Sequence, residues 1–477
     1  MFFNNWNKGA LCGGVLFASL CLYSCDNPSG SASSQDSQQE DSLMISRIYE
    51  HALTKGKAYN NLEYLTQEIG PRIAGSPKVQ EAVNWSKGLM EEIGFDSVYL
   101  QPLSLRYWDR GEPEVAYMVD GSNTPLSVLA LGGSVATPAA GLEAEVIEVD
   151  LLDELEEYGD AVKGKIVFVN KPWDETLIES GQAYGKNSSQ RFHGPVKAAE
   201  KGAIGYLFRS LSSSVDDYAH TGGTRYSEEV DSIPAMAISA LSANRLSDAL
   251  KENPNLKVFM KQNSAWKDEV ETHNLIAEWT GQEHPERIIT IGAHIDSWDV
   301  GEGAHDNGTG TMGILDAIAT LKELGYTPKN TIRIIYYMNE ENGVTGSIEY
   351  GERALEKGED LIAAIESDAG GFAPRGFNIH SNASQLAFIQ ANWQPLFEPY
   401  LVHYFKKGSP GVDSGVWGKH FPDAIMFNFK PDPHRYFGLH HSKKDVFEAV
   451  DKRELQSGVA SIASLLYLLD QDYDSLK

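Results

Sequence analysis

The sequence predicts an α/β fold, in which a mostly parallel central sheet is flanked by helices and a smaller α/β module is inserted. Two observations support this prediction. After residue 270, apolar strand-like runs alternate with segments that carry apolar residues at helical spacing, a pattern typical of parallel sheets covered on both faces. Between residues 126 and 265 the chain instead shows short apolar runs separated by glycine, proline and polar loops. A segment of this length is a normal size for a separate domain.

The composition is that of an ordinary globular protein with an acidic surface. The chain has 477 residues, of which 42% are hydrophobic and 22% charged, enough for two or three domains. Its net charge of −27 argues against nucleic acid as a partner, because phosphates are bound by basic groups. We interpret the acidity mainly as a source of solubility.

The first 25 residues predict a lipoprotein signal peptide. Lys8 precedes an apolar run that is too short to span a bilayer. The run ends in Leu-Tyr-Ser-Cys25, which resembles a bacterial lipobox and predicts a lipid anchor on Cys25. Because Tyr23 fits its position poorly, ordinary signal cleavage is the alternative. The protein is therefore expected to be exported and lipid-anchored in the bacterial cell envelope, on the periplasmic or outer-membrane face, or else secreted.

The leader is followed by a Ser-, Gln- and Asp-rich segment, residues 26–42, which is expected to be a flexible tether. All three cysteines lie within the first 25 residues. The mature chain is therefore expected to contain neither a disulfide nor a cysteine metal ligand.

Residues 43–125 are expected to form the first part of the main domain. Apolar residues recur at helical spacing in 43–56 and in 76–94, and the second of these helices is expected to end at Gly94. A glycine- and proline-containing turn, GPRIAGSP, separates them. Short strands joined by turns are expected from residue 98 onwards.

Residues 126–265 are expected to form the inserted α/β module. Its short strands are GKIVFVN, AIGYLFR and IPAMAIS, and FHGPVKAAEKG is a helix between the first two. Residues 212–232 form a long polar loop.

Residues 266–477 are expected to complete the main domain. HNLIAEWTG, RIITIGAHID, NTIRIIYYMNEE and DLIAAIESD are predicted strands. Helices are predicted between them at residues 308–325 and 345–358, and another apolar stretch, DAIMFNF, comes later.

Charged side chains follow three of the predicted strands, at the point where each strand ends. One strand ends in His294 and Asp296, with Asp306 in the loop behind it; the others end in the stretches 339–341 (Asn-Glu-Glu) and 366–368 (Glu-Ser-Asp). The carboxyl ends of parallel strands meet at one edge of the sheet, where open α/β folds bind ligands. Two further histidines, at 440 and 441, follow the late apolar stretch.

A cluster of like charges without lysine or arginine needs a counter-charge, and a divalent metal is the natural one. Imidazole and carboxylate ligands without sulfur suit zinc, with manganese and cobalt as alternatives. Five ligands exceed what one catalytic zinc usually takes from protein, so two zinc ions that share a carboxylate fit better, with a spare glutamate as general base. An acidic residue at a single strand end usually caps a helix or lies in a solvated loop. Acidic residues at three strand ends in register, together with paired histidines, instead favour a metal site.

Other motifs are weaker. Gly308, Gly310 and Gly313 match GxGxxG, but the first lies 12 residues after Asp296, too far for the tight turn of a dinucleotide site. We expect these glycines to allow close packing of a helix on the sheet. No GxSxG, HExxH or P-loop pattern occurs.

Four stretches, GAHIDSWDVGEGAHDNG, MNEENG, ESDAGG and FGLHHSKKD, resemble the co-catalytic two-zinc exopeptidases of the bacterial aminopeptidase and plasma glutamate carboxypeptidase type. GPRIAGSP and residues 183–240 resemble the same family, including its inserted protease-associated domain. The likeness covers nearly everything after residue 43. It implies a zinc-exopeptidase, phosphorylase/hydrolase-like fold, with 126–265 as the protease-associated domain.

The resemblance implies two zinc ions held by five side chains. His294 and Asp368 would bind one zinc, Glu341 and His441 the other, and Asp306 would bridge both. His441 is chosen over its neighbour because the family's ligand precedes Ser or Thr.

The resemblance also implies two catalytic residues. Glu340 would be the general base that takes a proton from the shared water and passes it to the leaving amine. Asp296 would orient His294 and tune the base. Asn307 stands where the family often has a second aspartate, but the bridging position itself is kept.

The remaining polar residues near these motifs are expected to have structural roles. His440 is expected to be a buried, hydrogen-bonded histidine, and Asp413 a helix cap. Tyr436 fits two roles equally, a donor to the reaction's oxyanion or a core tyrosine. Four others are expected to be surface or loop residues outside the ligand set: Asp299, Glu302, His193 and His220. His305 neighbours the bridge but matches no ligand position.

The resemblance therefore implies a di-zinc exopeptidase that hydrolyses a terminal peptide bond of dipeptides or short peptides with a free N-terminus. The family resemblance further implies that the inserted domain roofs the cleft and that the protein forms a homodimer. Two alternatives stay open. One is a glutaminyl-cyclase-like transferase with a related fold, and the other is a metal-free receptor or scaffold.

Overall fold

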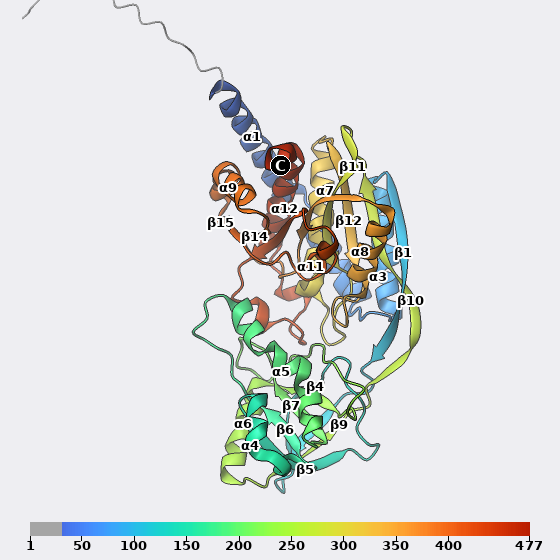
Figure 1. Cartoon of the computed structure of the whole chain (residues 1–477), viewed down its shortest axis with the longest axis vertical. Coiled ribbons are helices and arrows are strands. Elements are labelled where there is room, and N and C mark those ends of the chain that lie inside the picture. Colours follow the sequence, from blue (N-terminus) through green and yellow to red (C-terminus); the bar gives the residue numbers. More distant parts are fainter. Residues whose placement is uncertain (1–30) are drawn as a thin grey trace, which may run out of the picture.

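The computed structural model describes residues 31–477. The predicted signal peptide and Cys25 lie outside the described residues. The chain forms an elongated molecule with two sheets, and strands β1 and β10 run from the main body toward the smaller lobe (Figure 1). Within the described part of the chain, no helix has the length and apolar character needed to cross a membrane.

The central sheet has eight strands. In spatial order they are β1 (Ser97–Asp109), β10 (Ala265–Trp279), β12 (Asn330–Tyr337), β11 (His284–His294), β13 (Asp360–Glu366), β16 (Ile425–Pro431), β14 (Pro374–His380) and β15 (Tyr404–Lys407). The four middle strands, β12, β11, β13 and β16, are parallel, whereas β1 pairs antiparallel with β10, β10 with β12, and β14 with β16. The predicted α/β class is confirmed, and the parallel part of the sheet is its centre.

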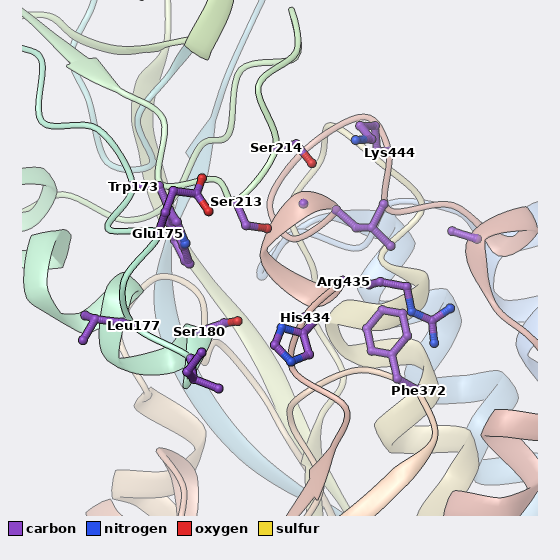
Figure 2. A pocket seen from close by; sticks show the side chains of 14 residues that line it. Trp173, Glu175, Leu177, Ser180, Ser213, Ser214, Phe372, His434, Arg435 and Lys444 are labelled. Atoms are coloured by element: carbon purple, nitrogen blue, oxygen red, sulfur yellow. The ribbon is translucent and has the colours of Figure 1, made fainter.

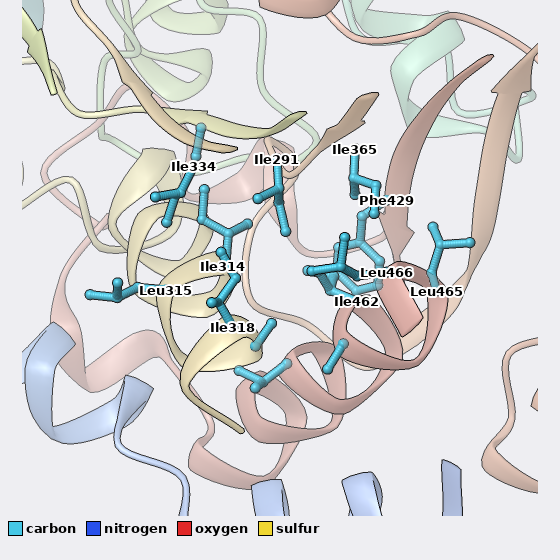
Figure 3. Close-up of a cluster of buried hydrophobic side chains, with 14 of the residues drawn as sticks. Ile291, Ile314, Leu315, Ile318, Ile334, Ile365, Phe429, Ile462, Leu465 and Leu466 are labelled. Carbon is cyan, nitrogen blue, oxygen red and sulfur yellow. The ribbon is translucent and has the colours of Figure 1, made fainter. Parts of the chain in front are cut away.

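Helices cover both faces of this sheet. Helices α1 (Ser31–Lys55), α7 (Thr309–Glu323) and α12 (Lys452–Asp472) pack on one face. Figure 3 shows the contact, in which Ile314 and Ile318 of α7 and Ile462 and Leu466 of α12 meet strand residues such as Ile291. Helices α8 (Thr345–Lys357) and α11 (Asp413–Trp417) pack on the other face. The all-buried strand β12 therefore has a helix layer on each side.

The remaining helices of the main body are short or lie at its edges. They are α2 (Ala58–Glu63), α3 (Pro77–Ile93), α9 (Ala383–Asn392) and α10 (Gln394–Phe397), with the single-turn segments η4 (Ala304–Gly308) and η7 (Tyr436–Gly438) near the strand ends.

Local signals place the predicted helix ends correctly. The side chain of Ser76 accepts a hydrogen bond from the Val79 amide at the start of α3, and Gly94 ends that helix in the left-handed conformation. Helix α7 likewise ends just before Gly325, whose φ is +78°. In contrast, the helix expected at 192–202 begins earlier and is α5 (Ser180–Glu200).

The second sheet also has eight strands, and it lies in the chain between β1 and β10. In spatial order they are β3 (Thr124–Pro125), β2 (Val115–Met118), β9 (Lys257–Lys261), β5 (Leu142–Val149), β6 (Ile166–Val169), β7 (Gly205–Arg209), β8 (Ala235–Ile238) and β4 (Val128–Ala130). Helices α4 (Leu155–Tyr158), α5 and α6 (Ala240–Glu252) accompany it.

Two predicted boundaries differ from the bounds of the described elements. The second sheet begins with β2 at Val115, before residue 126, because β2 pairs with the distant strand β9 and local pattern cannot show that pairing. The expected flexible tether, 26–42, is helical from Ser31. Ile45, Ile48 and Ala52 anchor α1 in the core, and a formed helix extends at little cost into adjoining polar residues. The Tyr467 hydroxyl also donates a hydrogen bond to Asp41 at 2.9 Å.

Candidate metal centre and active site

Four loops beyond the carboxyl ends of the central strands bring the predicted ligands together. His294 is the last residue of β11, and Asp306 lies in η4 behind it. Glu341 follows β12, Asp368 follows β13, and His441 follows η7. The expectation that these strand ends meet at one edge of the sheet is confirmed.

Asp306 stands between two histidines and gives one carboxylate oxygen to each. Its Oδ1 lies 3.3 Å from His294 Nε2, which is also 3.5 Å from Asp368 Oδ1. Its Oδ2 lies 3.2 Å from His441 Nε2, which is 3.0 Å from Glu341 Oε2. The arrangement has the form of two adjoining cation sites that share one carboxylate.

His440 lies closer to this cluster than expected. Its Nε2 is 3.5 Å from Asp306 Oδ2, and Asp306, His440 and His441 together have ligand atoms near enough to hold one metal ion. The rings of His440 and His441 stack with centroids 3.4 Å apart. The Nδ1 atom of His440 is buried without a hydrogen-bond partner among the described residues, so the expected role of His440 as a hydrogen-bonded core histidine is wrong.

The unsatisfied atoms of the cluster fit a cation. His294 Nε2, Glu341 Oε1 and Asp368 Oδ1 are buried and lack hydrogen-bond partners within the described residues, although buried polar atoms are normally paired. The Nδ1 atoms of His294 and His441 face the carbonyl oxygens of Asp296 at 3.0 Å and Thr221 at 3.2 Å. These contacts place the ring proton on Nδ1 and leave Nε2 free to bind a metal, as zinc-binding histidines require.

Burial and mutual repulsion shift the ionisation of the protein groups. Burial and the Asp306 charge raise the pKa of Glu341 to about 7, and burial with neighbouring carboxylates raises the pKa of Glu340 well above its usual range. Burial opposes charge on His294 and His441, but the carboxylates beside them raise both pKa values well above the usual one. Repulsion among the carboxylates and attraction to the two histidines therefore oppose each other within the cluster.

Asp296 fixes the loop that carries Glu340. Its Oδ1 accepts hydrogen bonds from the amides of Asn339 at 2.9 Å and Glu340 at 3.2 Å, and its Oδ2 accepts one from Glu341 at 3.4 Å. The contact of Asp296 with His294 is made mainly by its carbonyl oxygen, since the carboxylate is 3.6 Å away. Asp296 therefore fixes the position of His294 through its carbonyl oxygen and that of residues 339–341 through its carboxylate.

Asp299 and Glu302 are not solvated loop acids, which corrects the expectation. Asp299 forms an ion pair with Arg110 at 2.6 Å, and Arg110 also pairs with Glu114 at 3.1 Å. Glu302 accepts the amide of Phe447 at 2.8 Å. These partners lie far away in the chain, so the local sequence gives no sign of them.

Asp413 is not a helix cap either. It is the first residue of α11, and its carboxylate accepts a hydrogen bond from the Ser347 hydroxyl. The cap is supplied by Glu366, whose two carboxylate oxygens accept the amides of Val412 at 2.7 Å and Ser414 at 2.6 Å. Asp413 cannot cap α11 because it lies inside the helix.

His305 stays outside the ligand set, as expected. Its ring stacks on Phe372 with centroids 4.2 Å apart, and its Nδ1 accepts the Gly371 amide at 3.1 Å.

A loop of the second sheet packs directly on the two histidines. The Thr221 amide donates to the His441 carbonyl at 2.9 Å, while its own carbonyl faces His441 Nδ1. His220 is 2% exposed, and its Nδ1 lies 2.7 Å from the His440 carbonyl. The loop predicted as polar is thus buried here, and His220 is not a surface histidine. Sequence analysis missed Thr221, because a main-chain contact leaves no residue signature.

A cavity of about 400 Å³ adjoins the cluster. Asp306, Glu340 and Asp368 line it from the main body. The other wall includes side chains from the second-sheet segment that sequence analysis did not single out: Tyr184, Arg191, Phe192 and Arg225. Tyr436 also lines it, and burial raises the pKa of Tyr436 well above its usual range. This place in the cavity lining fits both predicted roles of Tyr436, a hydrogen-bond donor to the oxyanion and a core tyrosine.

A second cavity, of about 560 Å³, lies between the same two parts of the chain. Figure 2 shows Trp173 and Ser180 from the second-sheet segment facing His434 and Arg435. Its cationic side chains already have acidic partners, since Arg435 pairs with Glu454 and Lys444 with Asp216. None of the predicted ligands lines it.

Comparisons with known proteins agree with this geometry. Residues 274–466 match the model of peptidase family M28. Carboxypeptidase Q of Bos taurus is 30% identical over 416 residues, which cover 87% of this chain and 85% of that protein, and carboxypeptidase Q of Xenopus laevis is 31% identical, with 84% and 83% covered. The predicted resemblance to the co-catalytic zinc exopeptidases is thereby confirmed.

Solved structures agree as well. The peptidase M28 precursor from Shewanella amazonensis has a TM-score of 0.86 at 31% identity, covering 91% of this chain and 97% of that one. An aminopeptidase from an Aneurinibacillus strain shares the fold at 18% identity, with a TM-score of 0.60 and 88% and 95% covered. The chain therefore belongs to peptidase family M28 and is a metallopeptidase.

Proposed function

We propose that this protein is a zinc exopeptidase that removes the N-terminal residue from dipeptides and other short peptides. The observation that carries the proposal is the buried carboxylate of Asp306, which faces one histidine with each of its oxygens. Family membership supports the metallo-exopeptidase class, and an adjoining cavity of about 400 Å³ suits a small substrate.

The proposed cofactor is a pair of zinc ions. His294 and Asp368 would hold one, Glu341 and His441 the other, and Asp306 would bridge them. The unsatisfied nitrogen and oxygen atoms of these residues support this assignment, as does the absence of sulfur ligands among them. Zinc bound here would polarise the scissile carbonyl and make a water molecule more acidic.

The proposed general base is Glu340. It would take a proton from the attacking water and deliver it to the amine that leaves. Its backbone amide is fixed by Asp296, which keeps the loop in place during this transfer. Tyr436, in the same cavity, would donate its hydroxyl hydrogen to the oxyanion that forms at the carbonyl.

The segment predicted as the inserted protease-associated domain, residues 126–265, is proposed to be that domain, together with β2 (Val115–Met118) of the same sheet. Its loops close one side of the cavity, which would exclude long substrates. A lipid anchor on Cys25 would hold the protein at the membrane of the cell envelope, and a homodimer is a further part of this proposal.

The test compares the wild-type protein with Glu340→Gln and with Glu352→Gln, a matched change at an exposed residue of α8. Dipeptide hydrolysis and the metal content per chain are measured for each. We expect about two zinc ions in all three proteins. Glu340→Gln should lose activity by about 10²- to 10⁴-fold.

Two outcomes would contradict the proposal. If the wild type holds metal but cleaves no free or blocked peptide, a transferase becomes the better interpretation. If it binds no metal at neutral pH, the assigned ligands are wrong.

A further inference from the structure

Phe437 lies between the two cavities that are shared by the main body and the second-sheet segment. It lines the cavity of about 400 Å³ beside the metal cluster. The next two residues of the chain, Gly438 and Leu439, line the cavity of about 560 Å³. The chain therefore passes at Phe437 from the wall of one cavity to the wall of the other.

The ring of Phe437 packs against one aromatic side chain from each cavity. It stacks on Tyr184, which lines the smaller cavity, with centroids 4.7 Å apart and an interplanar angle of 22°. It also packs against Trp173, which lines the larger cavity (Figure 2), with centroids 5.5 Å apart. These three rings, which we call the aromatic partition, separate the two cavities.

The main chain of Phe437 is held independently of its ring. Its carbonyl oxygen accepts a hydrogen bond from the Ser213 amide of the second-sheet segment at 3.3 Å. Within the same loop, the Leu439 amide donates to the Tyr436 carbonyl at 2.9 Å. A smaller side chain at position 437 would therefore keep the path of the backbone and remove only the ring.

The larger cavity has side chains that suit part of a peptide. Ser180, Ser213 and Ser214 lie in its lining, beside the apolar side chains of Trp173 and Leu177. Hydroxyl groups can donate to or accept from the amide groups of a peptide, and apolar walls favour the burial of its side chains. A peptide that extends beyond the partition would therefore find a suitable surface there.

The aromatic partition lies close to the metal cluster. The ring of His440 is 5.3 Å from that of Tyr184 and 5.4 Å from that of Phe437, between centroids. An extended peptide advances by about 3.3–3.6 Å per residue. A peptide that runs from the cluster toward this wall therefore meets the partition within about two residues.

We infer that the aromatic partition sets the upper length of the substrate. The scissile bond lies at the metal cluster, and the residues that follow it extend toward the wall that includes Tyr184 and Phe437. A dipeptide ends before the partition, whereas longer peptides collide with its rings. This inference rests on the proposed exopeptidase function and adds the residues that limit peptide length.

The experiment measures kcat/KM for the first cleavage of L-alanyl-L-alanine, tri-L-alanine and tetra-L-alanine, with wild type, Phe437→Ala and Trp173→Ala. Phe259→Ala is the matched control. Phe259 is also half-buried, stacks on Tyr117 with centroids 4.8 Å apart, and lines neither cavity. Zinc content and thermal unfolding verify that each variant is loaded and folded.

We expect kcat/KM of the wild type to be about 10- to 200-fold higher for the dipeptide than for the longer peptides, the range of discrimination that an apolar wall provides. Phe437→Ala joins the two cavities and should reduce this difference by at least about 10-fold. Trp173→Ala opens the partition from the larger cavity and should shift the ratio in the same direction. Phe259→Ala should leave all three rates unchanged.

The inference is overturned if the wild type cleaves all three peptides equally well, or if Phe437→Ala keeps the wild-type ratio. If Phe437→Ala does not fold, the ratio measured with Trp173→Ala decides in its place. Each of these results leaves the exopeptidase proposal standing, because peptide bonds are still cleaved. Failure of the wild type to cleave any of the three peptides would overturn both.

Discussion

Asp296 has three backbone amides bound to its carboxylate and a histidine bound to its carbonyl. One residue thus sets the relative position of His294 and the loop of Glu340. The sequence could predict that Asp296 belongs to the site, because it lies two residues after His294 at a strand end. It could not predict this set of partners, since most are main-chain atoms.

Asp296→Asn should retain the fold and weaken the site. The amide replaces one acceptor oxygen with a donor that faces backbone N–H groups, so the loop of Glu340 loses its anchor. We expect activity or zinc affinity to fall by about 10- to 100-fold, the usual cost of losing a residue that supports a ligand. Metal titration and a pH–rate profile measure this. A normal profile with normal affinity would contradict a positioning role.

Zinc binding should release protons. Without metal, the neighbouring carboxylates raise the pKa values of His294 and His441 well above their usual range, so both rings are protonated at pH 7. A zinc ion can bind only to the neutral rings. The apparent affinity for zinc should therefore fall as pH falls. Calorimetric titrations in two buffers of different ionisation enthalpy would detect the release, and identical heats in both would contradict it.

At the scale of helices and strands, the sequence is informative where the pattern is local. Helix α3 has a serine cap and a terminal glycine, and both of its ends are predicted correctly. The buried strands β11, β12 and β13 are apolar runs of the expected kind. The second sheet starts earlier than the module predicted at residue 126, and part of the predicted tether is helical, because distant strand pairing and packing decide both.

Leu466 of α12 offers a test of the core between the sheet and its helices. It is fully buried in the main core cluster and lies beside Phe429 of β16 (Figure 3). Leu466→Ala should destabilise the protein by about 2–5 kcal/mol through lost burial and a residual cavity. Leu355→Ala on α8 removes the same atoms at a 51% exposed position and should change stability by less than about 0.5 kcal/mol. Chemical unfolding compares the two, and equal effects would contradict the assigned core.

At the scale of the whole molecule, the site is shared by two parts of the chain. The main body provides all the predicted ligands, and those were predictable from strand ends and motifs. The second-sheet segment provides Thr221 and the cavity-lining side chains of Tyr184, Arg191 and Phe192. These were not predictable, because the loop lies about 220 residues from the histidines and contacts them largely through its backbone.

Arg110 joins the two parts. It follows β1, pairs with Glu114 near the second sheet and with Asp299 in the loop after β11, and donates to the Ala130 carbonyl at 2.7 Å. Arg110→Ala leaves a buried carboxylate unpaired, so we expect a loss of about 3–5 kcal/mol. Arg245→Ala breaks an exposed pair and should cost about 0–1 kcal/mol. Thermal unfolding measures both, and equal midpoints would contradict a joining role for Arg110.

The contact between Thr221 and His441 is made by main-chain atoms on the side of the second sheet. The side chain at 221 has a separate role, because its hydroxyl donates a hydrogen bond to the Ala130 carbonyl at 2.7 Å, whereas the path of its backbone sets the contact with His441. Replacing the second-sheet segment with that of a relative would succeed only if the new loop places a carbonyl group at the same position beside His441. Deleting the second sheet would not open the cleft of an otherwise intact enzyme, because His441 would lose the group that sets its tautomer.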